Sequence, residues 1–163
     1  MNMDEWWGLV DRARAAVGDR ADDRDLPDDP LPAALVDVLA TLEPAEIVDF
    51  YVKMDFRGGL ILLGRGVFSR AVAHPDSLAG LSTVARMSRG EGGWIGYESV
   101  SCLIPDAYGR VQGETDSLDT AVATALSGMA RPEKPRGEKW NGDPEDEAQL
   151  RRRLPRLAAL FLD

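Results

Sequence analysis

One cysteine and one histidine could together supply nucleophilic catalysis. Cys102 and His74 could form a nucleophile and base pair, because a neighbouring imidazole favours the reactive thiolate. Cys102, however, lies in an apolar run, where free cysteine behaves as a small buried hydrophobic residue. His74 precedes a proline and suits a helix end. We therefore expect no catalytic residues here, and no zinc site, since zinc needs several converging ligands.

Two acidic runs could in principle bind calcium. The run at 22–29 lacks the glycine and the closing glutamate that a calcium loop requires. In the run at 141–147, Asp146 occupies the glycine position and Arg152 the closing one. We interpret the first run as a solvated loop and the second as the cap of a following helix, and we expect no metal.

A glycine-rich segment, RGGLILLGRG at 57–66, suggests a phosphate-binding loop. A Walker loop needs a lysine followed by serine or threonine, and a dinucleotide fingerprint needs three glycines at fixed spacing. The segment offers neither pattern. We expect a helix over 57–73 whose glycines allow a neighbouring helix to approach closely, with a short buried strand at 60–63 as the alternative. No cofactor is expected.

Charged and aromatic residues provide two further candidate sites. Arg57 and Arg65 could bind an anion together with Asp76, although pairing with helix ends or with that acid is the more ordinary role of such arginines. Trp6 and Trp7 are adjacent, hence about 100° apart on a helix, and cannot both face one core. One of them is expected at an edge, in a second packing contact or in an interface.

Apolar residues recur at helical spacing along most of the chain. The pattern predicts helices at 4–17, 31–42, 45–54, 57–73, 77–87, 116–130 and from 144 onward. Helix and strand compete over 94–108, with a break expected at Pro105. An acidic loop is expected at 19–30, and an irregular strap at 131–143.

The length of 163 residues and a hydrophobic content of 44% fit one domain with a core. No internal repeat with a period of 20–50 residues is present. The sequence therefore predicts an all-α fold over 1–163, a single-domain bundle of about six short helices with irregular connections rich in glycine and proline.

The charge balance and the cysteine count restrict the partners and the compartment. A formal net charge of −9 disfavours nucleic acid as a partner. No apolar stretch approaches the roughly 20 residues of a membrane span, so no membrane association is expected. A single cysteine cannot form an internal disulfide, and the first residues do not resemble a signal segment. We expect a cytoplasmic protein.

Three pieces of the chain resemble the bacterial domain of unknown function 4240 family. They are DEWWGLVDRARA at 4–15, FRGGLILLGRGVFSRAVAHPDSLA at 56–79 and EKWNGDPEDEAQLRRRLPRLAALF at 138–161. The chain departs from the family pattern at Gly59, where tryptophan is usual, and at Gly66, where glutamate is usual. It also runs straight from Asp55 into Phe56 without the family's preceding tryptophan-rich helix and loop, so it resembles a shortened member.

The resemblance implies a shared fold and cytosolic residence, and it brings no reaction, substrate or cofactor. The positions that match the family pattern are Phe56, Arg57, Leu60, Gly64, Arg65, Asp76, Ser77, Trp140 and Pro155.

The leading functional hypothesis is a protein-binding accessory module without catalysis, which contacts its partner through exposed tryptophan side chains. The alternative is an enzyme or small-anion-binding protein with a pocket around Arg57, Arg65 and Asp76. The residues expected to contribute to binding under one or other hypothesis are Trp7, Phe56, Arg57, Arg65, Asp76 and Trp140.

Overall fold

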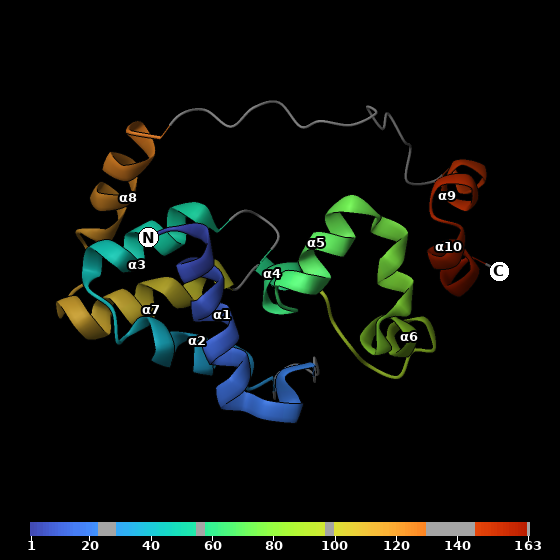
Figure 1. Ribbon diagram of the computed structural model, residues 1–163, viewed down its shortest axis with the longest axis horizontal. Helices are drawn as coiled ribbons and strands as arrows, with labels where there is room; N and C mark the ends of the chain where they lie inside the picture. The colour runs from blue at the N-terminus through green and yellow to red at the C-terminus, as the bar shows by residue number, and fades with distance from the viewer. Residues whose placement is uncertain (23–28, 55–57, 97–99, 130–145, 163) are drawn as a thin grey trace.

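The computed structural model describes residues 1–22, 29–54, 58–96, 100–129 and 146–162 (Figure 1). These ranges contain helices and no strand, which confirms the all-α class. The helices are more numerous than the expected six or so. They are α1 (Met3–Val17), η1 (Gly18–Asp22, a 3-10 helix), α2 (Leu31–Leu39), α3 (Pro44–Lys53), α4 (Gly58–Leu62), α5 (Arg65–Ala73), η2 (Pro75–Gly80, also 3-10), α6 (Ser82–Ser88), α7 (Val100–Gln112), α8 (Leu118–Ser127), α9 (Glu147–Arg153) and α10 (Pro155–Phe161).

The additional helices arise where expected single helices are divided. The helix expected at 57–73 is divided at Gly64, whose φ of +89° is a left-handed conformation that favours glycine. Arg14 donates from Nη1 to the carbonyl oxygen of Leu62 at 2.7 Å, which satisfies a group that a continuous helix would have bonded internally. The helix expected at 77–87 is similarly divided into η2 and α6.

Two other predictions need adjustment. The break expected at Pro105 is wrong, because this proline lies inside α7. Its missing N–H forfeits one hydrogen bond, while burial of Ile104, Ala107 and Tyr108 on the same helix stabilises α7. The first residues of the expected acidic loop form η1, and its residues 23–28 lie outside the described ranges, as does the whole strap at 131–143.

The hydrophobic core is formed by α1, α2, α3, α4 and α7, with a contribution from the start of α8. Trp6 lies at its centre, 1% exposed, and its ring stacks on Phe50 at 4.8 Å between centroids. Its indole N–H donates to the carbonyl oxygen of Phe50 at 3.1 Å, so burial leaves this polar group satisfied. Besides Trp6 and Phe50, the largest fully buried side chains of this core are Val10, Leu31, Leu35, Leu39, Ile47, Leu62 and Ile104.

A second group of helices lies beside the core. The contacts η2 makes with α5, α6 and α10 hold this group together, and α9 packs on α10. Figure 1 shows α5, α6, α9 and α10, coloured green to red, on the opposite side of the molecule from α3 and α8. In the ranges that the structure describes, no helix is both long and apolar enough to cross a membrane.

Candidate functional site

Three of the six expected binding residues, Phe56, Arg57 and Trp140, lie outside the described ranges. The other three are Trp7, Arg65 and Asp76. The structure places each of them in a separate structural contact, as described below.

Trp7 is buried, with 6% of its surface exposed. Its ring meets Trp6 edge to face at 4.9 Å and packs on Phe68 of α5 at 5.4 Å. Both tryptophans belong to the one hydrophobic core, so the expectation that adjacent tryptophans cannot both face one core is wrong. Trp6 stacks on Phe50, while Trp7 also packs on Phe68 of α5. The expectation that a tryptophan at this position offers exposed binding surface is also wrong.

Arg65 begins α5 and pairs with Asp4 in the first turn of α1, with 2.6 Å between Nη1 and Oδ1. Both side chains are more than half exposed, and exposed pairs of this kind contribute about 0–1 kcal/mol. The contact ties α5 to α1.

Asp76 caps a helix distant in sequence. Its carboxylate accepts hydrogen bonds from the backbone N–H groups of Arg156, at 3.0 and 3.2 Å, and Leu157, at 2.9 Å. The residue at the usual capping position of α10, Leu154, supplies no side-chain cap, so Asp76 takes that role. Because Arg65 and Asp76 bind different helices, the contacts described here do not bring them together into an anion site.

Cys102 is exposed, so the expectation of a buried cysteine is wrong. Cys102 and Ile104 are two residues apart, about 200° around α7, and Ile104 takes the buried face. His74 is exposed at the end of α5, on a different helix. In the described part of the chain, no group of three or more histidine, cysteine or acidic residues is arranged to hold a metal.

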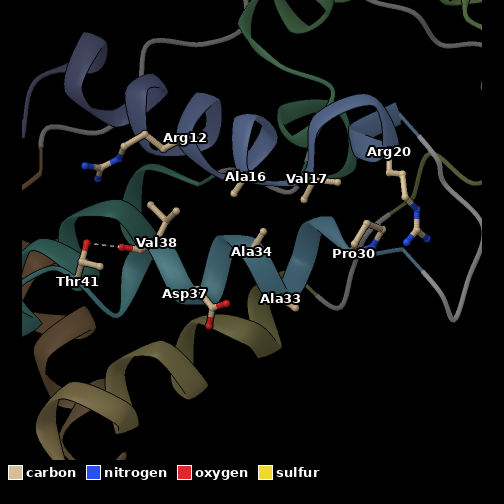
Figure 2. A pocket seen from close by; sticks show the side chains of 10 residues that line it. All are labelled: Arg12, Ala16, Val17, Arg20, Pro30, Ala33, Ala34, Asp37, Val38 and Thr41. Carbon is tan, nitrogen blue, oxygen red and sulfur yellow. Dashed lines mark hydrogen bonds between the residues drawn. The ribbon is translucent and has the colours of Figure 1, made fainter.

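The structure shows a site that sequence reasoning missed, a pocket of about 620 Å³ between α1 and α2 (Figure 2). The two helices run antiparallel, so Arg12 lies near Thr41 at one end and Arg20 near Pro30 at the other. We call this site the α1–α2 pocket. The lining residues are Arg12, Ala16, Val17, Arg20, Pro30, Ala33, Ala34, Asp37, Val38 and Thr41.

Small side chains explain why this space is not filled. Ala16 projects from α1 towards Ala34 of α2 in the middle of the pocket (Figure 2). Ala33, the residue before Ala34 on α2, also lines the pocket. A methyl group is too short to bridge the space between two helix surfaces that α1 and α2 otherwise fill with larger core residues. The result is a concave surface with an aliphatic floor.

The polar groups of the α1–α2 pocket are suited to binding. They comprise the guanidinium groups of Arg12 and Arg20, the Asp37 carboxylate and the Thr41 hydroxyl. Asp37 accepts from Arg110 of α7 at 2.7 Å, and Thr41 donates to the carbonyl oxygen of Val38 at 2.7 Å. The lining contains no cysteine or histidine, and its carboxylate already pairs with a guanidinium, so these side chains provide no nucleophile and base pair.

Residues 51–110 match the family model described as Protein of unknown function (DUF4240). Comparison with curated proteins and with solved structures gives no match. The matched range runs from the end of α3 into α7 and contains the middle of the three family-like pieces. The first and last pieces, at 4–15 and 138–161, lie outside it, as does the α1–α2 pocket. Over residues 51–110 the chain is therefore similar to the family of proteins of unknown function called DUF4240.

Proposed function

We propose that this chain is a protein-binding module without catalysis of its own, and that the α1–α2 pocket is where its partner docks. The observation that carries the proposal is an aliphatic floor of alanine and valine between two antiparallel helices, bordered by charged side chains. Grooves of this kind accept the apolar side chains of a partner segment, while polar groups at the border fix its orientation.

The exposure of the lining favours a macromolecule over a small metabolite. None of the ten lining residues is buried. A small-molecule site typically encloses 70–90% or more of its ligand, which requires walls that this pocket does not have. A partner segment, by contrast, needs only one face covered, because the rest of the partner shields the other face from water.

Two neighbouring alanines provide a matched test. Ala16 lines the pocket, whereas Ala15 is equally an exposed α1 residue outside it. Ala16→Trp should fill the pocket and abolish capture of a specific partner by the purified chain from cells that produce it. Ala15→Trp should retain that partner, since it places the same bulk on another face of the same helix. Circular dichroism establishes that both variants fold, and quantitative mass spectrometry measures the capture. The same captured proteins from all three chains would refute the proposal.

No contact among the described residues favours the alternative of a small-anion site around Arg57, Arg65 and Asp76. Arg65 and Asp76 are engaged with Asp4 and with the start of α10, respectively.

A further inference from the structure

We propose that copies of this chain associate head to tail, with the second helical group of one copy on the α3–α8 end of the next. The α3–α8 end consists of residues 43–53 and 100–129, which carry α3, α7 and α8. The second helical group consists of residues 65–96 and 146–162, which carry α5, η2, α6, α9 and α10. The inference goes beyond the proposed function, because neither surface includes a residue of the α1–α2 pocket.

The two surfaces carry opposite net charges. The second helical group contains eight arginines and four acidic residues, a net charge of +4. Arg65 pairs with Asp4 of α1, and counting that acid with the group still leaves a net charge of +3. The α3–α8 end contains seven acidic residues, one arginine and one lysine, a net charge of −5. Figure 1 shows the two parts on opposite sides of the molecule.

Exposed side chains carry much of this charge. Arg70, Arg152 and Arg156 are exposed in the second helical group. The exposed acidic residues of the α3–α8 end are Glu43, Glu46, Asp106, Glu114, Asp116 and Asp119. At physiological salt the Debye length is about 8 Å, so the charges that meet in a contact outweigh the net charge of each distant remainder. Attraction between these surfaces can therefore exceed the repulsion between two chains that each carry −9.

Exposed apolar side chains are concentrated on the same two surfaces. Seven large apolar side chains are exposed among the described residues, and six of them lie on one surface or the other. The six are Val111, Leu126 and Met129 on the α3–α8 end, and Val72, Trp94 and Phe161 on the second helical group. Interfaces between proteins combine apolar side chains with a polar border. Each surface has both components, and their charges are complementary.

These observations specify a second copy of the chain as the occupant. The surface that complements the second helical group in charge lies on the chain itself, so every copy carries both surfaces. Because the two surfaces differ, the contact is heterologous, and a pair of copies leaves one surface of each kind uncovered. Association can therefore continue from copy to copy as the concentration rises.

Sedimentation equilibrium of the full chain at several concentrations tests this inference. At about 0.1 M salt the weight-average mass should rise above 17.8 kDa as the concentration increases. At about 1 M salt the Debye length is only about 3 Å, and the association should weaken. A mass that stays at 17.8 kDa up to a concentration of about 1 mM would refute the proposal. Association of equal strength at both salt concentrations would refute it too, because complementary charges would then not drive the contact.

Charge-reversal variants distinguish the proposed contact from other kinds of self-association. Arg152→Glu alters the second helical group, and Asp119→Lys alters the α3–α8 end. Each variant alone should associate on the order of two- to tenfold more weakly than the parent chain. An equimolar mixture should recover association, because each variant supplies the surface that is altered in the other. A mixture that associates no more strongly than the separate variants would exclude the head-to-tail contact.

Asp11→Lys is the matched control. It makes the same charge change as Asp119→Lys at an exposed position of α1, outside both surfaces, and it should associate like the parent chain. If it weakens association as much as Asp119→Lys does, the α3–α8 end is not the contact. Circular dichroism establishes that all the variants fold. None of these results decides the proposed function, which the tryptophan variants of Ala16 and Ala15 test separately.

Discussion

Asp76 illustrates how a single carboxylate can organise two distant parts of this chain. Its acceptor atoms hold the N–H groups of residues 80 and 81 positions later, at the start of α10. Such caps contribute about 0.5–2 kcal/mol, and α10 has only seven residues and one buried side chain. A helix this short is not stable by itself, so its docking depends on individual contacts of this kind.

Replacing Asp76 should therefore loosen α10 before it affects the core. Asp76→Ala should lower the free energy of unfolding of the α10 region by about 0.5–2 kcal/mol, measured as faster amide hydrogen exchange at Ala158 and its neighbours. Asp76→Asn keeps an acceptor oxygen and should remain close to the parent chain. If the alanine and asparagine variants exchange at the same rate, the capping role is refuted.

Asp49 provides a pH-dependent contribution to stability. Partial burial acts to raise the pKa of its carboxyl, but hydrogen bonds from Lys53 and the terminal ammonium, together with their charges, oppose this effect and leave the pKa lowered. The folded-state pKa then lies below the unfolded value of about 3.9. The stabilisation is thus complete above the unfolded pKa and is lost as the pH falls through the folded one.

The test compares urea unfolding midpoints of the parent chain and Asp49→Asn from neutral pH downward. The parent should be the more stable at neutral pH, and the gap should narrow as the pH drops below about 4. A gap that stays constant down to the lowest pH would show that Asp49 does not titrate with folding.

At the scale of elements, the glycine-rich segment 58–66 depends on one position in particular. Gly64 joins α4 to α5 with φ +89°, and a Cβ added there would lie 3.3 Å from Nε of Arg14. Arg14 also donates to the carbonyl oxygen of Leu62. The same arginine therefore lies close to Gly64 and satisfies the carbonyl group that the helix break leaves without a partner. Gly66, only two residues later, is an ordinary helical position whose added Cβ would meet Nη1 of Arg70 at 3.5 Å.

Substitution of these two glycines by alanine should have opposite effects on the free energy of unfolding. Gly64→Ala should destabilise the chain by about 1–2 kcal/mol, because alanine resists the left-handed conformation and crowds Arg14. Gly66→Ala should be neutral or stabilising by up to about 1 kcal/mol, because alanine favours a helix. Urea unfolding measures both free energies. Equal changes in the two variants would contradict the assigned break at Gly64.

Helix positions could be predicted from sequence better than helix contacts could. The spacing of apolar residues located α1, α2 and α3 correctly, because amphipathic periodicity is a local property. The division at Gly64 depends on Arg14, which is distant in sequence, and the continuation through Pro105 depends on burial against the core. Such tertiary contacts leave no local periodic signal.

The α1–α2 pocket could not be predicted for a similar reason. Alanine at positions 16, 33 and 34 is common in helices and indicates nothing until the register of α1 against α2 is known. The number of aromatic residues predicts exposed surface around Trp6 or Trp7, because one core is not expected to absorb them all, yet Trp7 is buried and its ring packs on Phe68 of α5. The sequence indicates Asp76 as a candidate site residue but not its role as a helix cap, because the N–H group of Arg156 that it accepts from lies 80 positions away.

At the scale of the whole molecule, the family match and the proposed docking site occupy different parts of the chain. Residues 51–110 contribute α4 and α7 to the core, and they also contain α5, η2 and α6 of the second helical group. The pocket is built from α1 and α2, which precede this range. The matched segment therefore supports the helices that form the pocket through the shared core, and it is not part of the proposed binding surface.

Hydrogen exchange on the full chain with and without its captured partner tests the central claim most directly. The partner should slow amide exchange at the border of the pocket and leave α5 and α6 unchanged. The slowed residues should be 12–20 of α1 and η1, together with 31–41, which comprise α2 and the two residues after it. Protection confined to residues 58–96, with α1 and α2 unaffected, would contradict the account and move the binding surface into the family segment.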